Sequence, residues 1–354
     1  MRKRMIVMLL AGIMCLGMTA CQKKQVLDPT TGGSLDGAVE KEAISTDSGG
    51  KLIIYTSLKE SMISQLVKDF MAKNPDISTD YQSAGAGKLM AKIATERESG
   101  QIMADVIWTS EVPDFFSMKQ EGILMQYKPA GADQVLNPLE DTEDYFIPAR
   151  LGTLGIAYNT SFVKNPPKAW SDLCGPDFKD AFAIANPSQS GTSYVSVAML
   201  ESQFTDKIFK DLRSNGALVG QGSGQVVDDT SSGEIYGCLA VDYITFDKVN
   251  SGATLAMAYP EEMLVIPSPI AIFKDTKKPD AAKRFVDYMI TEDAQAIIAE
   301  NGTLPVLSTV KVPEKYNIPP ADEALKRGIK VDYQKMMIEK EARVDAFLKI
   351  MQGN

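Results

Sequence analysis

The segment Lys51-Leu52-Ile53-Ile54-Tyr55-Thr56 is a short apolar run, and it predicts a buried β-strand. A helix is expected next, because apolar residues recur there at helical spacing: Met62, Leu66, Val67, Phe70 and Met71. The alternation continues with a strand over 77–82, a helix with Leu89, Met90, Ile93 and Ala94 on its apolar face, and a strand over 104–109. Strands and helices at this spacing predict a parallel sheet with right-handed crossovers.

The rest of the chain repeats this alternation. Strands are expected over 155–158, 181–185, 236–241 and 269–273, and helices over 280–289 and 292–300. The pattern over 320–354 predicts helix, with Tyr333, Met337, Ala342 and Leu348 facing inward. A chain of 354 residues with 44% hydrophobic content is long enough for two domains with cores of their own. The fold class predicted from these elements is α/β.

The first 21 residues have the composition of a bacterial export signal. Residues 2–4 are basic, and residues 5–18 are apolar and uncharged but too few to span a bilayer as a helix. The ending Leu16-Gly17-Met18-Thr19-Ala20-Cys21 resembles the lipobox of bacterial lipoproteins, which implies removal of residues 1–20 and a lipid on Cys21. An uncleaved signal anchor is the alternative. Residues 21–50, rich in Gly, Ser and Thr, predict a flexible tether, so the protein is expected outside the cytoplasm and held at a membrane.

Composition excludes several classes of function. The formal net charge is −9, whereas binding to nucleic acid needs clustered Lys and Arg. The chain contains no histidine, so a Ser-His-Asp or Cys-His catalytic system is impossible and the usual zinc sites are excluded. Chemistry by paired carboxylates remains open. Cys174 and Cys238 could form a disulfide or remain free thiols. The apolar run around Cys238 favours a buried free thiol. No cofactor and no metal are expected.

The sharpest local signal for a ligand is Ser190-Gly191-Thr192, at a turn from a strand into a helix. Backbone N–H groups at a helix start, beside two hydroxyls, suit a phosphate, phosphonate or carboxylate. Simple capping of the helix explains the same residues without a ligand. The stretch Gly85-Ala86-Gly87-Lys88 resembles part of a nucleotide P-loop, but Gln82 and Leu89 stand where that loop needs Gly and Ser or Thr. Gly85 and Gly87 therefore predict only a second, weaker anion site.

Polar residues also follow the predicted strands at their carboxyl ends, where open α/β sheets bind ligands. These residues are Ser57, the turn 83–87, Ser110 and Glu111. Two acidic turns, Asp242-Tyr243 and Glu261-Glu262, offer carboxylates to ligand hydroxyls or to an ammonium group, with a solvated surface as the alternative. Arg150 is a candidate clamp for an anion, although a surface ion pair is the expectation for this arginine.

The order and spacing of these segments resemble the substrate-binding proteins of ABC importers, in the branch that contains the periplasmic ferric-ion-binding proteins. The likeness runs over roughly residues 51–310 and rests on segments 54–60, 83–87, 104–111, 190–192 and 280–300. It implies the type II periplasmic-binding-protein fold, in which two lobes of mainly parallel sheet flanked by helices are joined by two crossover strands. The boundaries expected here are lobe 1 from 51–150 and 262–310, lobe 2 from 151–261, and a C-terminal helical segment over 311–354.

The resemblance also has implications for the ligand. Ferric members hold iron with a histidine, a glutamate and two tyrosines, and the matching positions here are Leu58, Ser110, Tyr243 and Ile244. Only one of these is a ligand of hard metals, so iron bound in that way is not expected. The anion-holding turn of the family is retained at Ser190, Gly191 and Thr192, and Ser223 lies near another of the family's anion contacts. The likeness therefore implies a phosphorylated or phosphonate solute, with Asp242 and Glu261 recognising its organic part.

The function expected from sequence is a receptor without catalytic activity. It would be a monomer, tethered through Cys21, that closes around a small anionic solute and delivers it to the transmembrane subunits of an ABC permease. Receptors for ferric iron, thiamine or polyamines are the alternatives, because relatives with those ligands share the architecture. An exported hydrolase with paired carboxylates and a structural lipoprotein are the remaining alternatives.

Overall fold

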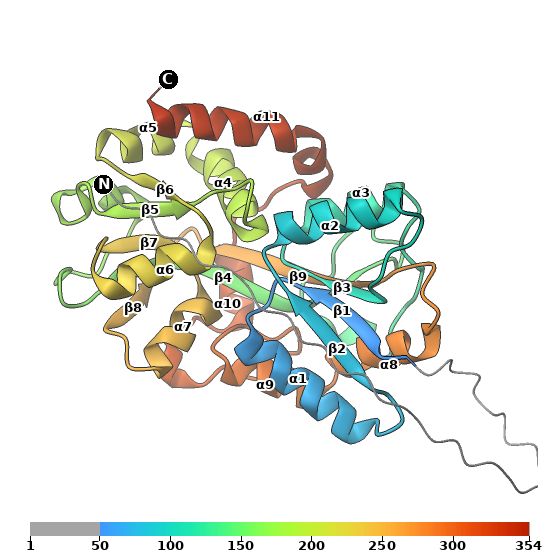
Figure 1. The fold of residues 1–354 in the computed structure, drawn as a ribbon. Helices are drawn as coiled ribbons and strands as arrows, with labels where there is room; N and C mark the ends of the chain where they lie inside the picture. Colours follow the sequence, from blue (N-terminus) through green and yellow to red (C-terminus); the bar gives the residue numbers. More distant parts are fainter. Residues whose placement is uncertain (1–49, 354) are drawn as a thin grey trace, which may run out of the picture. The chain divides into compact units, whose positions relative to one another are not determined.

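Figure 1 shows the computed structural model of the protein, in which residues 50–353 are described. The predicted signal sequence, Cys21 and nearly all of the tether lie outside these residues. The strands form a 9-stranded sheet in the order β2-β1-β3-β9-β4-β7-β5-β6, with β8 paired to β4. The strands are β1 (Leu52–Thr56), β2 (Thr79–Ser83), β3 (Val106–Trp108), β4 (Ile147–Asn159), β5 (Phe182–Ala185), β6 (Leu218–Gly220), β7 (Gly237–Val241), β8 (Leu255–Ala258) and β9 (Leu264–Ile272).

Helices cover both faces of this sheet. They are α1 (Glu60–Lys73), α2 (Ala86–Glu98), α3 (Val112–Gln120), α4 (Gly191–Phe204), α5 (Lys207–Ser214), α6 (Ser223–Ser232), α7 (Asp242–Asn250), α8 (Pro279–Met289), α9 (Glu292–Glu300), α10 (Ala321–Arg327) and α11 (Tyr333–Gln352). Short 3-10 turns lie at Ala132–Gln134, Trp170–Cys174, Pro176–Phe178 and Glu314–Tyr316.

Strand β1 explains why the first half of the sheet needs helices on both sides. Leu52 and Ile54 are buried in one hydrophobic core with residues of α1, α8 and α9, whereas Tyr55 is buried in a second core with residues of α2 and α3. Successive strand residues point to opposite faces of a sheet, so an apolar run without alternation predicts this double cover. In Figure 1, α2 and α3 lie on one side of β1–β3 and α1, α8 and α9 on the other.

Two long strands, β4 and β9, join the halves of the sheet. They pair antiparallel from Ile147 opposite Ile270 to Leu154 opposite Leu264. Strand β3 pairs with the last residues of β9, and β7 pairs with the last residues of β4. Lobe 1, which contains β1–β3, is therefore joined to lobe 2, which contains β5–β7, through two crossover strands. This confirms the predicted two-lobe α/β fold.

Both crossover strands begin earlier than the sequence pattern indicated. Strand β4 starts at Ile147 and β9 at Leu264, not at 155 and 269. Pro148, Pro267 and Pro269 interrupt these two stretches, and proline is normally confined to edge strands or strand ends. The apolar pattern was therefore hidden by the prolines, although nearly all of both strands is buried.

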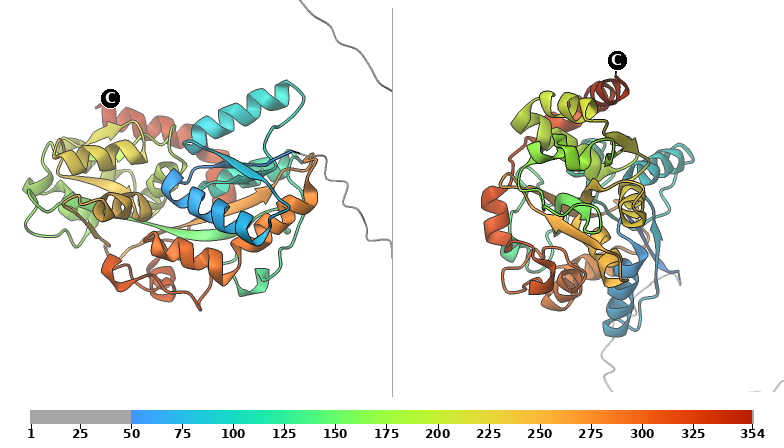
Figure 2. Two further views of the ribbon diagram at one scale, coloured as in Figure 1. Left: turned by 60° about the horizontal axis from the view of Figure 1, so that its bottom comes forward. Right: turned by 90° about the vertical axis from the view of Figure 1, so that its left-hand side faces the viewer.

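The C-terminal helix α11 contacts α3 of lobe 1 and both α4 and α5 of lobe 2. Figure 2 (right) shows α11 in red beside the yellow-green α4 and α5. The buried residues of α11 are Met336, Val344, Phe347 and Met351. The predicted inward face was wrong at Ala342, which is exposed because it lies off the single helical stripe formed by the four buried residues. Cys174 and Cys238 are free thiols.

Candidate functional site

A cavity of about 420 Å³ lies where the two lobes meet. Lobe 1 lines it with residues 57, 59, 83–86, 88 and 110, and lobe 2 with residues 189–192, 221–225, 241, 243 and 244. Most of the predicted binding residues lie in this lining: Ser57, Gly85, Ser110, Ser190, Gly191, Thr192, Ser223 and Tyr243. The other predicted residues, Gly87, Glu111, Asp242 and Glu261, do not line the cavity.

Three hydroxyl groups converge on the lobe 2 side of the cavity. The Ser190 Oγ atom is 2.7 Å from Ser223 Oγ and 3.0 Å from Thr192 Oγ1, and the Thr192 and Ser223 oxygens are 3.2 Å apart. Ser190 also caps α4, because its Oγ accepts a hydrogen bond from the Ser193 N–H at 3.3 Å. The capping interpretation and the ligand interpretation of this turn are therefore compatible. We call Ser190, Thr192 and Ser223 the hydroxyl cluster.

Helix N-termini surround the hydroxyl cluster. Helix α4 begins at Gly191, α6 at Ser223 and α2 at Ala86, and all three residues line the cavity. Neither α6 nor α2 has a side chain that caps its first N–H groups. The free N–H groups and the partial positive charge of a helix N-terminus favour an anion. Segments from both lobes thus present the same chemistry to one cavity.

Glycines allow the lobes to approach closely beside the cavity. A Cβ atom added to Gly87 would lie 2.7 Å from the Ser188 carbonyl oxygen, and one added to Gly85 would lie 3.0 Å from the Gln189 carbonyl oxygen. A Cβ on Gly191 would lie 2.7 Å from the Cβ of Glu111. Gly87 thus lies outside the lining but at the contact between the lobes, where a side chain has no room.

The cavity also contains two lysines that the sequence analysis left out. Lys59 and Lys88 line it together with Gln189, Gln221 and Gln225, and among residues 50–353 no carboxylate does. The sequence did contain a pattern that could have identified these lysines as cavity residues. Lys59 lies between the first strand and the first helix, and Lys88 follows Gly87. Both positions are at the ligand-binding ends of parallel strands.

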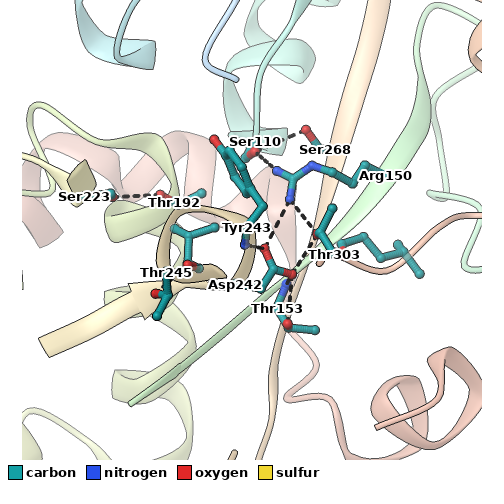
Figure 3. A network of polar contacts seen from close by, with 12 residues as sticks. Ser110, Arg150, Thr153, Thr192, Ser223, Asp242, Tyr243, Thr245, Ser268 and Thr303 are labelled. Atoms are coloured by element: carbon teal, nitrogen blue, oxygen red, sulfur yellow. Dashed lines mark hydrogen bonds and ion pairs between the residues drawn. The ribbon is translucent and has the colours of Figure 1, made fainter. Parts of the chain in front are cut away.

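Arg150 and Asp242 form a buried network behind the cavity, drawn in Figure 3. Arg150 lies within β4, is fully buried, and has its Nη1 atom 3.6 Å from the Asp242 carboxylate. The expected surface ion pair of Arg150 is therefore wrong, because the crossover strand begins before it. The guanidinium also donates to Ser110 Oγ at 2.9 Å and to Thr303 Oγ1 at 3.0 Å.

The carboxylate oxygens of Asp242 accept hydrogen bonds from other groups of the protein. Its Oδ2 atom accepts hydrogen bonds from the Thr153 N–H at 2.7 Å and the Thr303 hydroxyl at 2.7 Å, and its Oδ1 atom accepts one from the Tyr243 N–H at 2.6 Å. Burial raises the pKa of Asp242, against the lowering effect of Arg150. The neighbouring Tyr243 lines the cavity, with its ring 4.8 Å from the Arg150 guanidinium and its hydroxyl donating to the Ser57 carbonyl of lobe 1 at 3.3 Å.

Glu111 is also turned away from the cavity. Its carboxylate is fully buried and lies 2.5 Å from Lys340 Nζ of α11, which also contacts Asp114 at 2.8 Å. Burial and the nearby Asp114 raise the pKa of Glu111 to about 8, although Lys340 acts in the opposite direction. Glu261 is exposed and lies 3.6 Å from Arg327 Nε. Neither acid is positioned to contact a solute in the cavity.

A model of the bacterial extracellular solute-binding proteins matches residues 101–328. The chain belongs to this family. Solute-binding proteins of this family deliver solutes to ABC permeases outside the cytoplasm, and this chain is such a component of an importer. It is 23% identical over 259 residues to a Salmonella typhi periplasmic protein provisionally described as 2-aminoethylphosphonate-binding. The matched region covers 70% of this chain and 74% of the relative.

Solved structures of other binding proteins share the fold. One is the periplasmic binding protein AfuA from Actinobacillus pleuropneumoniae, with exogenous fructose-6-phosphate bound. The two structures superpose with a TM-score of 0.72 at 23% identity, and the match covers 86% of this chain and 99% of AfuA. Iron-bound HitA from Pseudomonas aeruginosa has a TM-score of 0.70 and 21% identity and covers 84% of this chain and 99% of HitA. These likenesses show that the chain shares its fold with binding proteins that include an iron-bound one.

The positions that match the ferric ligands do not form a metal site in this solute-binding protein. Leu58 is buried, Ser110 accepts from Arg150, and Tyr243 is hydrogen-bonded to Ser57. Within residues 50–353 no cluster of three or more Cys, Asp or Glu side chains has a geometry for a metal ion. Helices of that same part of the chain are all too short or too polar to cross a bilayer.

Proposed function

We propose that this solute-binding protein is the importer's receptor for a small solute with a phosphate or phosphonate group. The observation that carries the proposal is the hydroxyl cluster at the N-termini of α4 and α6, in a cavity that the described part of the chain lines with no carboxylate. Hydroxyls and free backbone N–H groups stabilise a phosphoryl group through several hydrogen bonds to its charged oxygens. The cavity volume is within the range usual for small-molecule sites.

The names of two relatives agree with this class of ligand. The Salmonella typhi protein is provisionally described as binding 2-aminoethylphosphonate, and the AfuA structure contains fructose-6-phosphate. A cationic solute such as thiamine or a polyamine lacks a counter-charge here, because Asp242 and Glu261 lie outside the lining. Ferric iron likewise lacks its set of ligands.

Ligand capture is proposed to occur by closure of the lobes around the solute. Lobe 1 comprises residues 51–150 and 262–310, lobe 2 comprises 151–261, and both contribute contacts to the cavity. A solute that contacts both lobes binds the closed state better than the open state, so it shifts the equilibrium towards closure. The segment 311–354 then serves as a C-terminal addition that packs on both lobes.

The receptor is proposed to be a monomer without catalytic activity, anchored through a lipid on Cys21. The tether to residue 50 would keep it close to the permease. Metabolic labelling with a fatty acid tests the anchor: the wild-type protein is expected to be labelled and membrane-bound, and a Cys21→Ser variant unlabelled and released. Label on the Cys21→Ser variant would contradict the assignment.

Thermal unfolding of residues 50–354 with phosphate esters, phosphonates, thiamine, spermidine and ferric salts tests the ligand class. A phosphorylated or phosphonate solute at about 100 times its dissociation constant is expected to stabilise the protein by roughly 2.7 kcal/mol. Ser190→Ala combined with Thr192→Val removes two hydroxyls of the cluster, and the affinity for that solute is expected to fall at least about tenfold.

Ser202→Ala is the matched control, because Ser202 lies at the far end of α4 and donates to the Met199 carbonyl. This variant is expected to bind like the wild type. Stabilisation by ferric iron, thiamine or spermidine alone would contradict the proposal, as would unchanged affinity in the Ser190/Thr192 double variant.

A further inference from the structure

The charges that line the cavity are all positive. Lys59 and Lys88 are the ionisable side chains in the lining other than Tyr243, which burial keeps protonated by raising its pKa to about 12. Within residues 50–353, neither lysine ammonium has a carboxylate oxygen within 4.0 Å. Two positive charges therefore face the cavity without a counter-charge from the described part of the protein.

Lys59 reaches from lobe 1 to the start of a lobe 2 helix. A Cβ atom added to Gly224 would lie 2.6 Å from Lys59 Nζ. Gly224 follows Ser223, a member of the hydroxyl cluster, and belongs to the first turn of α6. The Lys59 ammonium thus lies beside the cluster proposed to bind the phosphoryl group.

Lys88 lies at the N-terminus of another helix. It is the third residue of α2, whose first turn contains no acidic residue. A cation at a helix N-terminus is destabilised by the helix dipole, and an anion there is stabilised. The dipole of α2 therefore disfavours the charge of Lys88, and that of α6 disfavours the ammonium of Lys59, although Glu60 follows Lys59 in the chain. An anion bound between the lysines and these helix starts would stabilise both charges.

One phosphoryl group does not balance this arrangement. A phosphate monoester carries about −1.5 to −2 charges at neutral pH, which the two ammonium groups alone would neutralise. The N-termini of α2, α4 and α6 add about half a positive charge each, and this excess has no anion to meet. A solute with a second anionic group satisfies both lysines. An ammonium group on the solute would instead meet two like charges with no carboxylate to accept it.

We infer that the receptor selects a solute with two anionic groups, a phosphoryl group and a carboxylate or second phosphate, and that Lys59 and Lys88 determine this choice. This inference rests on the proposed function, since it places the phosphoryl group at the hydroxyl cluster. It implies that 2-aminoethylphosphonate, the compound in the provisional description of the Salmonella typhi relative, does not suit this cavity.

Titration calorimetry with two matched pairs of probes tests the inference. 3-Phosphoglycerate and glycerol 3-phosphate share a skeleton and differ in a carboxylate, and 2-aminoethylphosphonate and ethylphosphonate differ in an ammonium group. The affinity for 3-phosphoglycerate is expected to exceed that for glycerol 3-phosphate by about tenfold or more. A tenfold difference corresponds to about 1.4 kcal/mol, which one additional ion pair would supply. 2-Aminoethylphosphonate is expected to bind more weakly than ethylphosphonate.

Lysine variants assign the preference to residues. Lys59→Met and Lys88→Met, singly and together, are expected to reduce the ratio between 3-phosphoglycerate and glycerol 3-phosphate towards one. The ratio is measured within one variant, so a general loss of folding cancels. Lys68→Met is the control, because Lys68 is exposed on α1 and outside the lining, and its ratio is expected to equal that of the wild type.

The outcomes separate this inference from the proposed function. If phosphoryl probes bind with equal affinity within each pair, or if 2-aminoethylphosphonate binds best, the two-anion inference is overturned and the proposed function stands. An unchanged ratio in the double lysine variant would also overturn it. If none of the four probes binds, the proposed function itself fails.

Discussion

Arg150 and Asp242 show at the residue scale how one buried ion pair supports the connection between the lobes. Both side chains are fully buried, and Thr303 bridges them by accepting from the guanidinium and donating to the carboxylate. Arg150 belongs to crossover strand β4 and Asp242 begins α7 of lobe 2. Their contacts are made to the protein, so their role is structural.

Removing one partner of this pair is expected to leave a buried charge without compensation. Arg150→Met should lower the free energy of unfolding by about 3 kcal/mol, and adding Asp242→Asn should restore part of the loss. Urea unfolding measures both. Arg284→Met serves as the control, since its ion pair with Asp76 is exposed and is expected to contribute less than about 1 kcal/mol. Additive losses in the double variant would contradict the coupling.

Helix α11 shows at the element scale how the C-terminal segment contributes to both lobes. Lys340 pairs with Glu111 and Asp114 on the lobe 1 side, and Arg343 pairs with Glu201 of α4 in lobe 2. The rings of Phe347 and Phe209 of α5 pack edge to face with centroids 5.0 Å apart. Two carboxylates share Lys340, and burial favours the neutral form of one of them.

The stability of the protein is expected to fall as the pH rises because of Glu111. Its pKa is about 8 in the folded protein and about 4.3 when unfolded, so the folded state binds the extra proton between these values. The contribution is complete below about pH 4.3 and is lost as the pH rises through about 8. Glu111→Gln should therefore flatten the free energy of unfolding across this range, measured by urea titrations.

A matched control is Glu341→Gln, because Glu341 is an exposed residue of α11. This variant is expected to keep the pH dependence of the wild type. A wild-type-like slope in Glu111→Gln would mean that Glu111 does not hold the proton.

Close contact between the lobes is the feature that matters at the scale of the whole molecule. The start of α2 faces the Ser188–Gln189 carbonyls, and the start of α4 faces Glu111, with a glycine at each contact. The cavity proposed to bind the solute lies beside these contacts, so the proposed closure and the proposed ligand binding would require the same approach of the lobes.

Gly87→Ala is expected to separate closure from stability. The added methyl group meets the Ser188 carbonyl only when the lobes are together, so the affinity for the solute should fall about tenfold. Alanine is a better helix former than glycine by roughly 0.5–1 kcal/mol, so the melting temperature without solute should stay the same or rise. Small-angle scattering should show a smaller solute-induced decrease in the radius of gyration than in the wild type. Unchanged affinity would contradict this role of Gly87.

Sequence patterns predicted the first three strands and first two helices of lobe 1 but not helix α3. The apolar run 52–56 and the helical spacing from Met62 to Phe70 depend only on local periodicity. The same approach missed the starts of β4 and β9, where Pro148 lies opposite Pro269 beside a shift in register between Pro148 and Arg150.

By itself, the sequence determined the α/β alternation, the strand-to-helix turn that Ser190 caps and the absence of histidine chemistry. Tertiary structure alone decided which polar residues face the cavity. Asp242 and Glu111 had the same local signature as true cavity residues, yet packing against Thr303 and Lys340 occupies both. Lys59 and Lys88 line the same cavity only because lobe 1 packs against lobe 2. The physical reason is that periodicity and capping act within a few residues, whereas burial and charge pairing depend on segments far apart in the chain.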